Sequence, residues 1–243
     1  MVALDAKTGR GLWAMDLTFA NYFESPSVAN GVVIAGRQAF DAVTGKQLWG
    51  IAWNDAHKCG PSLALDIAVT ISGNSVYLRC GDGSLETRDL KTGAIRAIRP
   101  STPDGTTQVV AGGIMYYGSA GRLVARRATN GALVWQAAAG ASVGQPAVGA
   151  GAAVAIVGGR KVESFDLATG RAEWIRDVGA EAQPPAVANG IVYVRTACAL
   201  RALDAGTGAV LRTVATRCSS GRSGTVGSVA GGWVFSGSEA LVS

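Results

Sequence analysis

The chain has 243 residues, 48% of them hydrophobic and 16% charged, and its formal net charge is +5. This composition excludes an intrinsically disordered chain, because disordered chains are poor in apolar residues and rich in charge. The length suits a single domain. No stretch is both long enough and apolar enough to cross a bilayer, so we expect no transmembrane segment in this chain.

A motif of the form Asp-x-x-Thr-Gly-x-x-x-Trp begins at Asp5 and returns along the whole chain. Its glycines are Gly9, Gly45, Gly93, Gly131, Gly170 and Gly208. Asp and Thr side chains bond to nearby backbone amides in turns, and glycine adopts the positive φ that tight turns require. Because β-prone residues flank the motif, we expect each copy to form a hairpin.

The first and last positions of the motif vary little. The aspartates are Asp5, Asp41, Asp89, Asp166 and Asp204, and Arg127 stands in the remaining copy. The tryptophans are Trp13, Trp49, Trp135 and Trp174, and Ala97 and Arg212 stand in the other two copies. Tryptophans that recur in one register indicate a repeat protein.

A second kind of hairpin lies between the copies of the motif. In chain order these hairpins cover 26–36, 71–80, 109–118, 146–158, 185–195 and 226–237. Asn30-Gly31 and Asn189-Gly190 are dipeptides typical of two-residue hairpin turns. Two hairpins in each repeat of about 40 residues predict four-stranded antiparallel blades, and therefore an all-β propeller.

The chain begins in the middle of one repeat and ends in the middle of another. Six hairpins of each kind predict six blades. We expect the C-terminal first hairpin, 223–243, to complete the blade begun by 1–17, because a closed ring leaves no free sheet edge. The sequence therefore predicts one propeller domain over 1–243.

Four cysteines are expected to lie on one face of this propeller. Cys59 and Cys218 lie in loops that enter a first strand, and Cys80 and Cys198 lie in or near loops between a second and a third strand. Loops of these two types share a face of a propeller, so the pairs Cys59–Cys80 and Cys198–Cys218 are feasible disulfides. Disulfides would indicate an oxidising compartment, and four unrelated thiols are the alternative.

The repeated motif resembles the PQQ-like repeat, the Trp-docking blade of quinoprotein dehydrogenases and of non-enzymatic relatives. The resemblance covers essentially the whole chain. It implies that the Trp side chains dock between neighbouring blades and that the Asp-Thr-Gly turns brace them. Trp13, Trp49, Trp135 and Trp174 would then join blade to blade, and Ala97 and Arg212 would leave two seams more loosely sealed.

The chain departs from the dehydrogenases of this family in its chemistry. Those enzymes usually have eight blades, a metal ion, a catalytic Asp and often adjacent cysteines, whereas this sequence has six copies and no adjacent cysteine pair. The only histidine, His57, lies in a polar loop without a partner that would make it a general base. We therefore predict no catalytic residue and no metal ligand. We expect no cofactor, with PQQ as the alternative.

The basic residues are expected to gather on the face that carries the cysteine loops. The candidates for this basic face are Arg37, Lys58, Arg79, Arg122, Arg160, Lys161, Arg195, Arg217 and Arg222. A basic propeller mouth attracts anions, such as an acidic protein or a polycarboxylate cofactor. Ordinary surface arginines are the alternative interpretation. Nucleic-acid binding is not expected, because no exposed aromatic residues are interleaved with the arginines.

The function that this pattern favours is a non-catalytic propeller that binds a ligand or a protein. Its partner would be a protein or an acidic ligand on the basic face, and the chain would be a monomer. One alternative is a PQQ-binding quinoprotein oxidoreductase or its inactive remnant, and another is a purely structural or engineered scaffold. A native N-terminus missing from this sequence would imply an extracytoplasmic or secreted protein, and otherwise the protein would be cytoplasmic.

Overall fold

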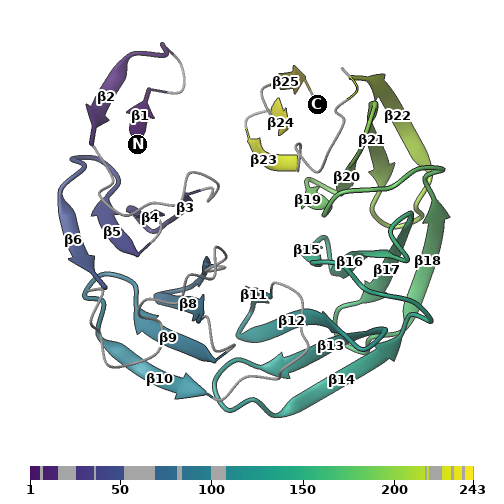
Figure 1. Ribbon diagram of the computed structural model, residues 1–243, viewed down its shortest axis with the longest axis horizontal. Coiled ribbons are helices and arrows are strands. Elements are labelled where there is room, and N and C mark those ends of the chain that lie inside the picture. The colour runs from purple at the N-terminus through teal and green to yellow at the C-terminus, as the bar shows by residue number, and fades with distance from the viewer. Residues whose placement is uncertain are drawn as a thin grey trace. The chain divides into compact units, whose positions relative to one another are not determined.

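A computed structural model describes most of the chain (Figure 1). The residues outside the description are 6–7, 16–25, 36, 52–68, 81–83, 100–107, 217, 219–225, 231–232, 237–238 and 243, together with the side chains of Arg79 and of 226–242. The structure divides into two compact units, Met1–Pro103 and Asp104–Ser243, and the single propeller domain over 1–243 stays a prediction. The division falls directly after the outer strand that carries Ala97 in place of Trp.

The first unit contains a two-stranded and two four-stranded antiparallel sheets. Its strands are β1 (Val2–Leu4), β2 (Gly11–Ala14), β3 (Ser27–Ala29), β4 (Val32–Ala35), β5 (Gln38–Asp41), β6 (Gln47–Gly50), β7 (Val69–Ser72), β8 (Ser75–Arg79), β9 (Leu85–Asp89) and β10 (Ile95–Arg99). Each four-stranded sheet uses four strands in chain order, so one first hairpin and one motif hairpin make one blade.

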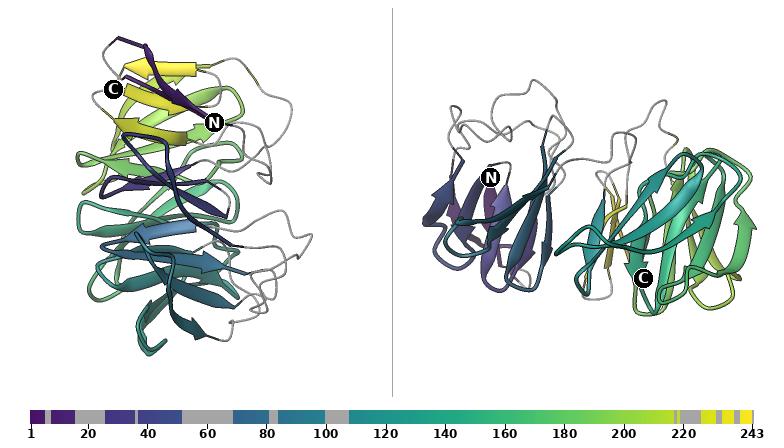
Figure 2. Two further views of the ribbon diagram at one scale, coloured as in Figure 1. Left: turned by 90° about the vertical axis from the view of Figure 1, so that its left-hand side faces the viewer. Right: turned by 90° about the horizontal axis from the view of Figure 1, so that it is seen from below.

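The second unit contains three four-stranded sheets and one three-stranded sheet. Its strands are β11 (Val109–Ala111), β12 (Ile114–Ser119), β13 (Arg122–Arg127), β14 (Leu133–Ala138), β15 (Ala147–Gly149), β16 (Ala152–Val157), β17 (Lys161–Asp166), β18 (Ala172–Asp177), β19 (Ala186–Ala188), β20 (Ile191–Thr196), β21 (Ala199–Asp204), β22 (Val210–Ala215), β23 (Val226–Ala230), β24 (Trp233–Ser236) and β25 (Glu239–Val242). Within this unit the three four-stranded sheets lie side by side (Figure 2).

The all-β prediction is confirmed, since the described residues contain strands and turns but no helix. The predicted turn chemistry explains why the strands end where they do. Asn30 and Asn189 adopt φ values of 49° and 52°, and the glycines that follow them adopt 75° and 76°, as two-residue hairpin turns demand. All six motif glycines have φ between 67° and 73°, a region that glycine enters at little cost.

The core lies between neighbouring sheets and is made mostly by their middle strands. All six residues of β16 are buried, because both faces of its sheet pack against another sheet. Such strands lack the alternation of apolar and polar residues that marks a half-buried strand. Between two of the sheets, Val154 and Ile156 pack in one cluster with Val192 and Val194 of the next sheet.

The two ends of the chain differ from the predicted pair of hairpins. The segment 223–243 contains three strands, because β25 adds to the expected hairpin and pairs with β24 through Phe235 and Ala240. The N-terminal hairpin forms a two-stranded sheet of its own, β1–β2. Together, the three strands β23–β25 and the two strands β1–β2 are more than the four strands of one blade. The composite blade and the closed six-bladed ring therefore stay predictions.

Candidate functional site

The Asp-x-x-Thr-Gly turn is a compact hydrogen-bonded unit. In each of the five aspartate copies, Asp Oδ1 accepts bonds from the amide and the hydroxyl of the Thr three residues later. In the copy without Asp, Asn130 Oδ1 accepts from the amide of Ala132 at 3.0 Å instead. The bonds from Thr92 lower the pKa of Asp89 to about 2, with a further contribution from the guanidinium of Arg96.

Each of the four motif tryptophans lies on the turn of the next sheet in the chain. Trp49 Nε1 donates to the carbonyl of Leu90 at 2.9 Å, and its indole covers Gly93 so closely that a Cβ on that glycine would lie 2.6 Å from the ring. Trp135 makes the same contacts with Leu167 and Gly170. Trp13 likewise contacts Ala42 and Gly45, and Trp174 contacts Ala205 and Gly208. The motif thus joins neighbouring sheets. We call the contact between the Trp of one sheet and the motif Gly of the next sheet a joint.

Two glutamates occupy the same position in two different sheets but have different surroundings. Glu86 lies on β9 opposite Ile98, and Glu163 lies on β17 opposite Ile175. Glu86 is 1% exposed and forms a buried ion pair with Arg88. Two residues after Glu163 the sequence has Phe165 instead of an arginine.

The carboxylate of Glu163 is therefore buried without a strong partner. Glu163 is 8% exposed, and its Oε2 has no hydrogen-bond partner among the described residues. Burial raises the pKa of Glu163, and the ammonium of Lys161 only partly opposes this shift.

The predicted basic face is partly described. Arg122 and Lys161 begin the third strands of neighbouring sheets and are exposed, so the fold brings them to the same end of these sheets. Arg160 forms an ion pair with Asp177, with Nη2 2.8 Å from Oδ2, and Arg195 is 5% exposed. Arg37 is half-buried. Lys58, Arg217, Arg222 and the side chain of Arg79 lie outside the described residues.

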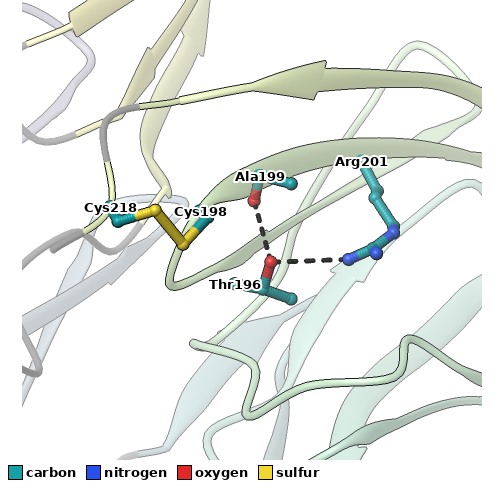
Figure 3. Close-up of a disulfide and its surroundings, with 5 residues drawn as sticks. All are labelled: Thr196, Cys198, Ala199, Arg201 and Cys218. Carbon is teal, nitrogen blue, oxygen red and sulfur yellow. Dashed lines mark hydrogen bonds between the residues drawn. A yellow bond between two sulfur atoms is a disulfide. The ribbon is translucent and has the colours of Figure 1, made fainter. Parts of the chain in front are cut away.

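The disulfide between Cys198 and Cys218 is confirmed (Figure 3). Cys198 lies in the turn between β20 and β21, and Cys218 follows β22. Cys80 is also disulfide-bonded, and its predicted partner Cys59 lies outside the described residues. One of the two predicted disulfides is therefore confirmed, and the pairing of Cys80 with Cys59 stays a prediction.

The described residues contain no group of three or more His, Cys, Asp or Glu side chains that could hold a metal ion. The absence of a cofactor stays a prediction. His57 lies outside the described residues.

A surface that the sequence analysis missed lies on the outermost strands. In the second unit, β14, β18 and β22 are the last strands of their sheets, so in the described part of the chain one edge of each has no strand partner. Their exposed aliphatic residues, here called the outer-strand set, are Leu133, Val134, Ile175, Val210 and Leu211. The counterparts in the first unit are Leu12, Leu48, Ile95 and Ile98. The aliphatic residue before the motif Trp, as in Leu12 and Leu48, was the signal for this surface in the sequence.

Repeated four-stranded sheets joined by Trp and Gly define a β-propeller of the PQQ-like, Trp-docking class. A family model described as "Outer membrane protein assembly factor BamB" matches residues 1–109 and 103–214. Since these matches cover most of the chain, the protein belongs to this PQQ-like family, as its repeat motif predicted. Among the described residues, no helix is long and apolar enough to cross a membrane.

Two solved structures illustrate the shared fold. BamB from Moraxella catarrhalis has a TM-score of 0.58 and 17% identity over 89% of this chain and 70% of that chain. The computationally designed Ika8 protein has a TM-score of 0.65 and 16% identity over 95% of this chain and 72% of that chain. At these identities the likeness shows the fold alone. No curated protein matches the sequence.

Proposed function

We propose that this protein is a non-catalytic β-propeller that binds other proteins outside the cytoplasm. The outer-strand set carries this proposal. The motif Asp and Thr side chains bond within the turns, whereas five aliphatic side chains on β14, β18 and β22 of the second unit are exposed. Exposed aliphatic side chains suit contact with another polypeptide rather than catalysis.

The family and the cysteines support the same proposal. The matching family model is described as an assembly factor for outer membrane proteins, which is a role exercised on other proteins. The Cys198–Cys218 disulfide supports a location outside the cytoplasm, because disulfides persist in oxidising compartments. A monomer closed at six blades is the form that we propose for this role.

The basic face is a second contact region within the same proposal. Arg122 and Lys161 are exposed at one end of neighbouring sheets, where they would attract acidic groups of a partner. This region differs from the outer-strand set in its chemistry and in its place on the sheets. The two regions can therefore be tested separately.

Site-specific photo-crosslinking in the native host tests this function. A photoreactive residue at Leu211 reports on the outer strands, and one at Lys161 reports on the basic face. We expect covalent adducts with other proteins from Leu211. Adducts from Lys161 alone would move the binding region to the basic face, and no adduct from either position would contradict protein binding.

A further inference from the structure

The Cys198–Cys218 disulfide lies on the surface, at one end of the β19–β22 sheet. Cys198 stands in the two-residue turn after Thr196, and both cysteines of the pair are exposed. The amide of Thr216 donates to the carbonyl of Cys198 at 2.9 Å. The disulfide thus ties the end of β22 to the β20–β21 turn (Figure 3), just before the chain continues to β23.

The disulfide of Cys80 provides a contrast within the same chain. Cys80 follows β8 at the turn between the second and third strands of its sheet, which is the place that Cys198 occupies in the β19–β22 sheet. Cys80 is 4% exposed, however, whereas Cys198 and Cys218 are exposed. A disulfide opens only when a thiolate reaches one of its sulfurs, so access decides which of two disulfides reacts.

We propose that Cys198–Cys218 is a site of reversible thiol–disulfide exchange with a dithiol oxidoreductase of the Cys-x-x-Cys class, whereas the buried Cys80 is not a point of attack. One thiolate of the partner attacks a sulfur of the pair, the S–S bond breaks, and the other cysteine leaves as a thiolate that takes up a proton. The second thiol of the partner then breaks the mixed disulfide. The partner's dithiol becomes a disulfide, and two electrons and two protons end on Cys198 and Cys218.

Reduction changes how the C-terminal sheet is held. β23 lies beside β19 and β20, and the disulfide fixes Cys218, which lies between β22 and β23 in the chain, to the β20–β21 turn. Once the disulfide opens, the β23–β25 sheet is held to its neighbour by the backbone that continues from β22 and by non-covalent contacts. We expect faster amide hydrogen exchange in β23–β25 on reduction, with the exchange of β19–β22 little changed.

Graded reduction of the native protein with dithiothreitol tests the chemical part. The thiols are alkylated at each time point and located by peptide mass spectrometry. We expect Cys198 and Cys218 to be labelled at least about tenfold faster than Cys80, because access limits the attack. Equal labelling rates, or faster labelling of Cys80, would overturn the proposal.

Two further measurements test the partner and the consequence. Thioredoxin with its second active-site cysteine replaced by Ser should trap a mixed disulfide at Cys198 or Cys218, and trapping at neither position contradicts the assigned partner class. The double variant Cys198→Ser/Cys218→Ser should show the faster exchange in β23–β25 without any reductant. If that variant exchanges like the oxidised protein, the disulfide does not control the C-terminal sheet.

Discussion

The motif glycines show how one residue position can meet two different constraints. Gly170 and Gly131 adopt nearly the same φ, 73° and 71°, in the same kind of turn. A Cβ on Gly170 would lie 2.5 Å from the indole of Trp135, whereas a Cβ on Gly131 would meet no described atom within 4 Å. The backbone strain of an alanine is therefore common to both positions, and the collision with Trp is specific to Gly170.

This difference allows a matched prediction. Gly131→Ala should lower the free energy of unfolding by about 1–2 kcal/mol, the strain of a left-handed alanine. Gly170→Ala should cost about 1–3 kcal/mol more, because the added methyl group overpacks the joint. Urea unfolding measures both variants. Equal losses in the two variants would mean that the indole does not occupy the space above Gly170.

The two buried glutamates give a second pair of predictions at the residue scale. Burial raises the pKa of Glu163, so its contribution to stability is complete below its ordinary pKa of 4.5 and is lost as the pH rises through the folded-state pKa. Glu163→Gln should therefore stabilise the protein at neutral pH by about 1–2 kcal/mol, since it removes an unpaired buried charge. In acid this advantage should disappear.

Glu86→Gln is the control for this prediction. It removes the charge that pairs with Arg88, so it should destabilise the protein at neutral pH by about 1–3 kcal/mol. The two substitutions are chemically identical and lie at the same position of two sheets. Chemical unfolding at a series of pH values measures both, and effects of the same sign would refute the assigned environments.

At the scale of the elements, the joint between two sheets depends on one side chain. Trp49→Ala removes the packing on Gly93 and should cost about 3–5 kcal/mol, as for other buried aromatic residues. Trp49→Phe keeps much of the packing but loses the bond to the Leu90 carbonyl, which should cost about 1–2 kcal/mol. A loss below about 1 kcal/mol for Trp49→Ala would show that the Trp does not join the sheets.

The turns should make the protein sensitive to acid. Hydrogen bonds from the Thr three residues later lower the pKa of Asp41, Asp89 and Asp166. Their stabilisation is present above the ordinary pKa of 3.8 and is lost as the pH falls through the folded-state values. The urea midpoint should fall in this range, and Asp166→Asn should show a smaller fall than the wild-type protein. An unchanged acid dependence in that variant would contradict the role of the turn.

The repeat made most of the architecture predictable at this scale. Asp, Thr, Gly and Trp each have a physical task in the joint, so their spacing predicted the turns and the order of the strands. The third strand at the C-terminus was not predicted, because Glu239–Val242 has no motif after it that would mark it as part of a hairpin. The burial of Arg195 was also missed, since a strand buried on both faces does not alternate and its sequence does not show which polar residue is covered.

At the scale of the whole molecule, the residues that hold the sheets together are different from the aliphatic residues that face solvent. The Trp joints lie within each unit, and the outer-strand set lies on β14, β18 and β22, each of which has one edge without a strand partner among the described residues. The sequence predicted binding on the basic face, because charged residues can be identified from the sequence alone. The aliphatic residues before the motif Trp were a signal for the outer surface, but only the strand order shows that they lie on the last strands of their sheets.

Substitution of Leu211 most directly tests whether the outer-strand set binds protein without holding the sheets together. Leu211 is 57% exposed on the last strand of its sheet, and Val28, which is 64% exposed on β3, the first strand of its sheet, is its matched control. A photoreactive residue at Ile175, on the neighbouring outer strand, reports the yield of crosslinked partner in each variant.

Leu211→Ser should lower the crosslink yield several-fold while the free energy of unfolding changes by less than about 0.5 kcal/mol, as for other surface substitutions. Val28→Ser should change neither quantity. An unchanged yield in Leu211→Ser, or a loss of stability as large as that of Trp49→Ala, would contradict a protein-binding role for the outer strands.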